Sequence, residues 1–99
     1  MSSACILEFN GVSASQYHEV NGYLGIDEAN AEGDWPAGMV SHTGSNGDHD
    51  NFVVFEVWDS KEAQHDFMES RLGAALGKAG LPEPSRFEWF DVEGHWQRP

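Results

Sequence analysis

The sequence contains little basic charge. Its 99 residues include five Lys and Arg against 17 Asp and Glu, which gives a formal net charge of −12. The phosphate backbone of a nucleic acid would be repelled by such a chain, so we expect no nucleic-acid partner. The excess of acidic residues would keep the protein soluble, or it would form a surface that recruits a basic partner.

Cysteine and long apolar runs are also scarce. The single Cys5 provides no disulfide framework, and its position inside a predicted strand indicates a buried thiol rather than a nucleophile. No apolar run approaches the roughly 20 residues that span a membrane, and no signal-peptide pattern is present. We therefore expect a cytoplasmic protein with no membrane partner.

Aromatic residues, by contrast, are plentiful. Hydrophobic residues make up 39% of the chain and include four Trp, six Phe and two Tyr, which predicts one folded domain over residues 1–99. The densest segment is 52–58, FVVFEVW, in which Glu56 is the only charge. Because a strand with one solvated face would alternate apolar and polar residues, this run predicts a strand covered on both faces.

A helix is predicted to follow this strand, with Ser60 as its N-cap and Gly80 at its C-terminal end. Its apolar residues fall into two stripes on nearly opposite sides of an ideal helix, which one straight helix cannot bury against one sheet. We therefore expect a break at 69–71, with Ser70 capping the second piece. The stripes are Ala63 and Phe67, and then Met68, Leu72, Ala75, Leu76 and Ala79.

The rest of the chain completes a βαββαβ order. A capping box, Ser13 with Gln16, opens a first helix that ends at Gly25. The sequence predicts strands at 4–9, 38–43, 52–58 and 86–92, a loop at 26–37 and a hairpin turn at 44–50. This is the α+β, ferredoxin-like plan, in which four antiparallel strands take the sheet order 4-1-3-2 with both helices on one face.

The other face of this sheet would be left without helices. Val53, Phe55 and Val57 point to it and are as apolar as the residues between them. An uncovered apolar face marks an interface, so we expect a homodimer whose two sheets pack face to face into a barrel. The alternative is a monomer in which the C-terminal tail hides this face.

Two segments carry a resemblance to a known superfamily. Residues 55–63, FEVWDSKEA, followed by Phe67, are similar to a strand, Trp-x-Ser, helix segment, and residues 36–42, PAGMVSH, resemble the entry into the second strand of small bacterial members. The chain thus resembles the dimeric α+β barrel superfamily, whose best-known branch is the antibiotic-biosynthesis monooxygenases. The resemblance implies a dimer and, in many members, chemistry without a cofactor.

The haem-degrading branch of that superfamily is disfavoured by this comparison. Asn10 matches the Asn that this branch uses near haem, but Phe67 replaces its Trp and Gly77 replaces its iron-ligating His. A substitute ligand would have to come from His65 or His42, and nothing in the sequence supports either. We expect no cofactor.

Two carboxylates interrupt otherwise apolar strands. If Glu8 and Glu56 share a face of neighbouring strands, they would meet on an apolar surface and one could be a base with a raised pKa. Alternatively both point to strand ends or water, or an arginine, Arg71 or Arg86, satisfies them. Neither alternative is excluded by the sequence.

His42 is the best single candidate for an acid or base, because imidazole titrates near neutral pH. The competing interpretation is a hydrogen-bonded structural histidine. The nearby turn at 48–50, Asp-His-Asp, lacks the ligand spacing of an EF-hand, and no zinc pattern is present, so we expect no metal.

These residues lead to two functional hypotheses. The first is a cofactor-independent, monooxygenase-like enzyme that uses His42, Glu8 or Glu56 on a small aromatic or polyketide-like substrate. The second is a non-catalytic dimeric module that binds a small hydrophobic molecule or only assembles, and it predicts no polar group inside any cavity. The residues expected to contact the small molecule are Asn10, Tyr23, Trp58, Phe67 and Trp89, with Tyr17 and Phe90 as further aromatic neighbours.

Overall fold

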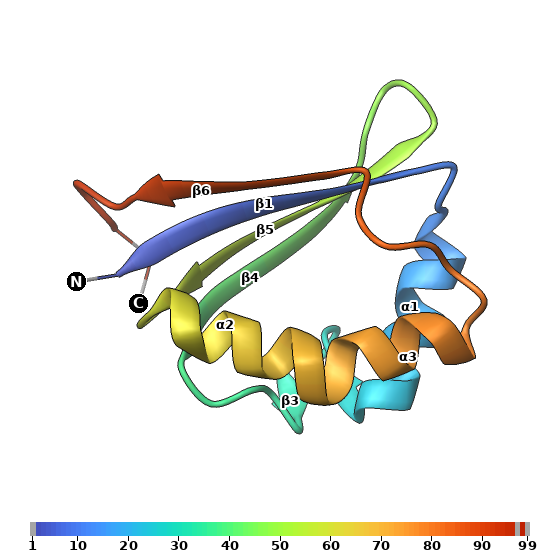
Figure 1. Cartoon of the computed structure of the whole chain (residues 1–99), viewed down its shortest axis with the longest axis horizontal. Helices are drawn as coiled ribbons and strands as arrows, with labels where there is room; N and C mark the ends of the chain where they lie inside the picture. Colours follow the sequence, from blue (N-terminus) through green and yellow to red (C-terminus); the bar gives the residue numbers. More distant parts are fainter. Residues whose placement is uncertain (1, 97, 99) are drawn as a thin grey trace.

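A four-stranded antiparallel sheet forms one layer of the computed structural model, which describes residues 2–96 and 98. Its strands lie in the order β4-β5-β1-β6 (Figure 1). The bounds are β1, Ser3–Asn10; β4, Met39–Asn46; β5, Asn51–Trp58; and β6, Arg86–Asp91. In chain order these are the first, second, third and fourth predicted strands, so the 4-1-3-2 order is confirmed.

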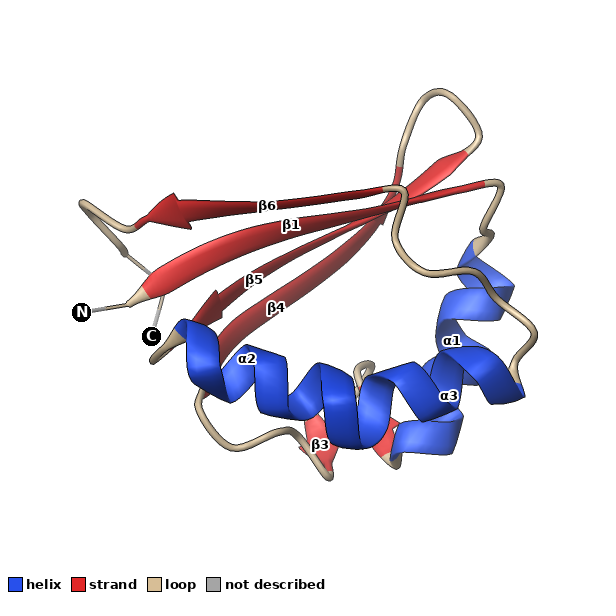
Figure 2. Cartoon of the chain, viewed as in Figure 1, coloured by secondary structure: helices blue, strands red, loops and turns tan. Residues whose placement is uncertain are grey.

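All the helices cover one face of this sheet (Figure 2). They are α1 (Ala14–Leu24), α2 (Lys61–Phe67), the π-helical turn η1 (Met68–Leu72) and α3 (Gly73–Lys78). The capping box of Ser13 and Gln16 opens α1, and Gly25 closes it with a left-handed φ of 75°. Ser60 accepts a hydrogen bond from the amide of Ala63 at 3.1 Å, so this cap is also confirmed.

The predicted break between α2 and α3 is a π-helical turn rather than a chain interruption. An i→i+5 turn adds one residue and rotates the helix that follows. As a result Phe67, Leu72 and Leu76, which belong to different stripes of an ideal helix, all line the space beneath the sheet. The prediction that Ser70 caps a second helix is wrong, because its hydroxyl donates to the carbonyl oxygen of Asp66 at 2.6 Å.

The segment 26–37, expected to be a loop, contains a small hairpin. Strands β2 (Ile26–Asp27) and β3 (Glu32–Gly33) pair with each other in a separate two-stranded sheet. Arg71 of η1 holds this segment in place, since it donates to the carbonyl oxygens of Leu24 at 2.9 Å and Asp34 at 2.7 Å. These contacts come from a residue distant in the sequence, so the local sequence pattern alone did not predict the hairpin.

The two faces of β5 have different surroundings. Phe52, Val54, Glu56 and Trp58 face the helices and are buried. On the other face Phe55 is 41% exposed, whereas Val57 is buried. The C-terminal segment 94–96 lies beside these two residues, but its Trp96 is 80% exposed. The tail therefore covers the outer face only in part.

No helix in the described part of the chain has the length and apolar character needed to cross a membrane.

Candidate functional site

A buried carboxylate lies at the centre of the sheet. Cys5, Glu56 and His42 occupy one row across β1, β5 and β4. The Oε2 atom of Glu56 is 2.9 Å from Nδ1 of His42, and its Oε1 accepts from the indole of Trp58 at 3.0 Å. The side chains of His42 and Glu56 are only 12% and 5% exposed. Because a buried charge is costly unless partners compensate it, these donors keep Glu56 in place.

Cys5 is the third donor to Glu56, with its Sγ 3.8 Å from Oε1. Burial, and then the charge of Glu56, raise the pKa of Cys5 to about 12. The thiol therefore stays protonated near neutral pH, as the expected buried thiol, and acts as a weak hydrogen-bond donor.

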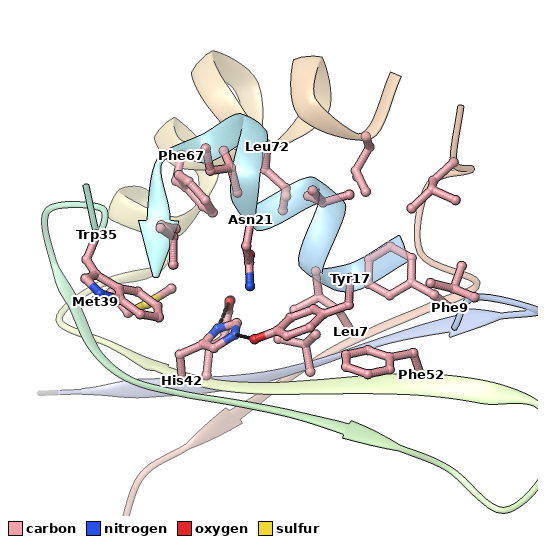
Figure 3. A pocket seen from close by; sticks show the side chains of 18 residues that line it. Leu7, Phe9, Tyr17, Asn21, Trp35, Met39, His42, Phe52, Phe67 and Leu72 are labelled. Atoms are coloured by element: carbon pink, nitrogen blue, oxygen red, sulfur yellow. Dashed lines mark hydrogen bonds and ion pairs between the residues drawn. The ribbon is translucent and has the colours of Figure 1, made fainter. Parts of the chain in front are cut away.

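Tyr17 of α1 completes a three-residue chain of hydrogen bonds. Its hydroxyl lies 2.6 Å from Nε2 of His42 (Figure 3). A carboxylate can only accept hydrogen bonds, so neutral His42 carries its proton on Nδ1, towards Glu56, and its Nε2 accepts from Tyr17. Burial raises the pKa of Tyr17, a hydrogen bond with Asn21 opposes the shift, and the charges of Glu28 and Glu56 add to it. Tyr17 is thus a protonated donor near neutral pH.

Gly44 and Phe52 position the Tyr17 ring. Gly44 follows His42 by two residues in β4 and so faces the same side. A Cβ atom built on Gly44 would lie 2.7 Å from Cζ and 2.9 Å from the hydroxyl oxygen of Tyr17. The Phe52 ring stacks on Tyr17 with centroids 4.5 Å apart. The missing side chain at residue 44 is therefore what allows the phenol to reach His42.

The three-residue chain faces an apolar cavity of about 50 Å³ between the sheet and the helices. This is room for a few water molecules, so a ring-sized ligand would need the walls of the cavity to move apart. Its wall is formed by Leu7, Phe9, Val12, Tyr17, Val20, Asn21, Leu24, Ile26, Trp35, Met39, His42, Phe52, Val54, Glu56, Phe67, Leu72, Leu76 and Leu81 (Figure 3). An apolar pocket with a few convergent polar groups is the usual form of a small-molecule site.

Asn21 is the remaining polar group of this wall. It reaches from α1 towards His42 and Tyr17 (Figure 3), and its Nδ2 donates to Glu28 Oε2 at 3.1 Å. Glu28 also pairs with His18. Burial raises the pKa of Glu28, but hydrogen bonds from its own backbone, His18 and Asn21 outweigh burial, and the pKa is lowered. Glu28 is therefore an anion that orients Asn21.

The structure separates the residues predicted to be catalytic. His42 and Glu56 come together, but Glu8 pairs with Val53 across β1 and β5 and so lies on the opposite face from Glu56. Glu8 accepts a hydrogen bond from Asn51. The possible meeting of two carboxylates is thus wrong, because each β-strand residue faces the side opposite to its neighbour. The alternative in which Arg71 or Arg86 satisfies Glu56 is wrong as well, since Arg71 binds backbone carbonyls and Arg86 pairs with Glu88.

The residues predicted to contact a small molecule are also divided. Phe67 lines the cavity, and Trp58 is fully buried behind it as a donor to Glu56. Tyr23 is 45% exposed and donates to Glu19, and Trp89 lines a separate groove. Asn10 is exposed at the end of β1.

The sequence pattern did not reveal the places of Asn21, Trp35 and Gly44 at the site, or the bond from Tyr17 to His42. Tyr17, Val20 and Leu24 recur at the spacing of one helix face, and Asn21, four residues after Tyr17, falls on that same face.

Two of the positions considered for haem, Gly77 and His65, lie outside the cavity. Gly77 and His65 line the groove between α2, α3 and β6, where the His65 side chain is 70% exposed and pairs with Glu69 at 3.8 Å. Among residues 2–96 and 98, no three His, Cys, Asp or Glu side chains lie close enough together to hold a metal ion.

Comparison with known proteins identifies the fold. No protein-family model matches the sequence, and no curated protein sequence matches it significantly. The structure is similar to the cofactor-independent oxygenase SnoaB from Streptomyces nogalater, with 17% identity, 98% of both chains covered and a TM-score of 0.61. It is also similar to a candidate antibiotic biosynthesis monooxygenase from Chloroflexus aurantiacus J-10-fl, with 15% identity, 97% and 98% coverage and a TM-score of 0.63.

A third similar structure is NE2512, a protein of unknown function from Nitrosomonas europaea, with 17% identity, 99% and 95% coverage and a TM-score of 0.69. The chain therefore has the ferredoxin-like α+β fold of the antibiotic-biosynthesis-monooxygenase-like proteins over its whole length. At these identities the likeness concerns the fold.

We predict that Gly44→Ala displaces the Tyr17 phenol, because the new methyl group would overlap it. In a Tyr23→Phe background, which leaves Tyr17 as the one tyrosine, ultraviolet titration should then give a pKa nearer the ordinary value of about 10. Gly22→Ala is the matched control, since nothing lies within 4 Å of the added atom. An unchanged Tyr17 titration in Gly44→Ala would contradict this account of the site.

Proposed function

We propose that the protein is a cofactor-independent oxygenase that acts on a compact, flat, mostly apolar molecule with a weakly acidic C–H group. The observation that carries this proposal is the chain of Tyr17, His42 and Glu56 on the wall of an apolar cavity. The similarity to SnoaB, whose name describes a cofactor-independent oxygenase, supports the same chemistry.

The first step is removal of a proton from the substrate. Tyr17 donates its hydroxyl proton to Nε2 of His42 and takes up the substrate proton, so that His42 is the base and Tyr17 transmits the proton. The carboxylate of Glu56, 2.9 Å from Nδ1, stabilises the imidazolium ion that forms. The apolar walls exclude water, which would otherwise weaken these electrostatic interactions.

Molecular oxygen is the co-reactant of the second step. The substrate carbanion reduces O₂ and forms a C–O bond, and the resulting peroxide takes back the proton from His42. The O–O bond then breaks, and the second C–H proton leaves together with the hydroxide as one molecule of water, which leaves a carbonyl group. The balance is R₂CH₂ + O₂ → R₂C=O + H₂O, so the electrons come from the substrate and no further reductant is needed.

The polar residues of the cavity favour catalysis over the non-catalytic hypothesis. A module that only binds a hydrophobic molecule predicts a cavity without polar groups, yet Tyr17, Asn21, His42 and Glu56 all contribute to this wall. Burying a carboxylate and an imidazole contributes nothing to apolar binding and carries a desolvation cost. A proton-transfer site needs both groups.

Oxygen uptake tests this function. We expect the protein to consume O₂ with 2-indanone or anthrone, two flat ketones with acidic CH₂ groups, and to keep this activity after dialysis against EDTA. His42→Gln should lower the rate about 10²–10⁴-fold, the usual contribution of a general base, and Tyr17→Phe should lower it as well. The control is His65→Gln, whose imidazole is 70% exposed on α2. Equal rates for wild type and His42→Gln, or no uptake with either ketone, would refute the proposal.

We further propose that a second copy of the chain covers the outer face of the sheet. Phe55 and Phe90 are each 41% exposed there, and Ile6 lies between them in β1. All the helices lie on the other side (Figure 1), so within residues 2–96 and 98 only the segment 94–96 covers part of this face. A two-fold dimer would bury the same apolar patch from both subunits.

Light scattering tests this assembly. The chain mass is 11.0 kDa, so a dimer has twice that mass. We expect the dimer mass at micromolar concentration and the monomer mass for Phe55→Glu, because a charge would be buried in the interface. Tyr23→Glu, an equally exposed aromatic position on α1, should remain a dimer. A wild-type particle of 11.0 kDa would refute the dimer.

A further inference from the structure

A surface cleft of about 500 Å³ lies against the edge strand β4. It shares Tyr17, Trp35, Met39 and His42 with the inner cavity, so these four side chains form the partition between the two spaces. Both members of the Tyr17–His42 hydrogen bond can therefore be approached from the cleft. The rest of the cleft is lined by His18, Glu28, Ala31, Val40, Ser41 and Gly44.

Trp35 is the largest part of this partition that does not belong to the proton-transfer chain. Its ring centroid lies 5.5 Å from that of His42, with the planes at 58°. Trp35 and Met39 stand together at one end of the cavity, next to His42 (Figure 3). A molecule that passes from the cleft to the cavity must pass among the four side chains of the partition, of which Trp35 is the largest.

The short backbone segment that carries Trp35 is fixed on both sides. On one side the amide of Asp34 donates to the carbonyl oxygen of Gly25 at 2.7 Å, and Arg71 holds the carbonyl of Asp34 at the same distance. On the other side the carbonyl of Gly38 accepts from the amide of Asp59 at 2.7 Å. Between these anchors, the carbonyl of Pro36 also accepts from the amide of Met39 at 3.3 Å, so a movement of the indole would be a rotation of the Trp35 side chain and not of the backbone.

A second route to the cavity is less suitable. The groove between α2, α3 and β6 is larger, about 890 Å³, but it shares Leu76 and Leu81 with the cavity. Both are aliphatic residues on the side of the helices. A molecule in that groove contacts neither Tyr17 nor His42, the groups that would act on it.

We propose that Trp35 is the gate between the cleft and the cavity and that it determines the size of the ring system the site accepts. The inference rests on the proposed function for the reaction, but ring-size selection is a property of binding. With the indole in place, the cavity of about 50 Å³ is too small for a ring system, so a molecule enters only when the indole swings aside, and a larger flat molecule needs a wider opening. Removing the indole therefore speeds the entrance of large rings more than that of small ones.

The test measures association rates under nitrogen, so that no oxidation takes place. Phenol, 2-naphthol and 2-anthrol carry one hydroxyl each on one, two and three rings, and their own fluorescence or absorbance reports binding by stopped flow. We expect Trp35→Ala to raise the association rate of 2-anthrol about tenfold and that of phenol by less than about threefold, within the range that interface changes produce in association rates. Trp35→Phe should fall between wild type and Trp35→Ala.

Two matched tryptophan variants serve as controls. Trp96→Ala removes an 80% exposed indole on the outer face, and Trp89→Ala opens the groove on the other side of the cavity. Neither should change the ratio of the 2-anthrol and phenol rates. An unchanged ratio in both Trp35 variants, a larger change in Trp89→Ala, or no binding of any probe would overturn the gate.

These outcomes are separable from those of the proposed function. Ring-size selection that responds to Trp35, with no oxygen uptake in air, supports the gate and refutes the oxygenase. If oxygen uptake depends on His42 but the ratio of the 2-anthrol and phenol association rates is the same in the Trp35 variants, the oxygenase is supported and the gate is refuted.

Discussion

The carboxylate of Glu56 is the constraint on which the site depends. The Glu56 side chain is only 5% exposed in the middle of an apolar sheet, and its charge is compensated by donors from three strands: His42, Trp58 and Cys5. An unpaired charge at this depth would cost several kcal/mol. The hydrogen bond to Glu56 therefore orients the His42 ring, and in this orientation the second ring nitrogen faces Tyr17. The single charged residue of an apolar strand thus positions the polar groups of the cavity.

Two local departures from regular packing shape the wall of the cavity. The π-helical turn at 68–72 rotates α3 so that the apolar side chains on both sides of the turn face the sheet. An ideal straight helix would turn one of its two apolar stripes away from the sheet. Gly44 leaves β4 without a side chain where Tyr17 comes closest, so the phenol can reach His42. The turn thus determines which apolar residues line the cavity, and Gly44 determines where the phenol lies in its wall.

The sequence predicted the architecture better than the site. The apolar run at 52–58, the capping box at Ser13 and the helix break near Ser70 depend on neighbouring residues, and such patterns are readable from the chain. The pairing of Glu56 with His42, and its separation from Glu8, depends on register across strands distant in sequence. A shift of one residue reverses every side chain in a strand, and β4 contains such an irregularity between Met39 and Ser41. Propensity patterns do not encode that register.

The protonation of the His42 ring tests the central claim most directly. A long-range ¹H–¹⁵N correlation spectrum of ¹⁵N-histidine-labelled protein, with His42→Gln to assign the signals among the five histidines, reports which ring nitrogen carries the proton in the neutral form. The buried carboxylate of Glu56 requires that proton on Nδ1, so that Nε2 is free to accept from Tyr17. A neutral His42 with its proton on Nε2 would mean that Glu56 does not organise this site.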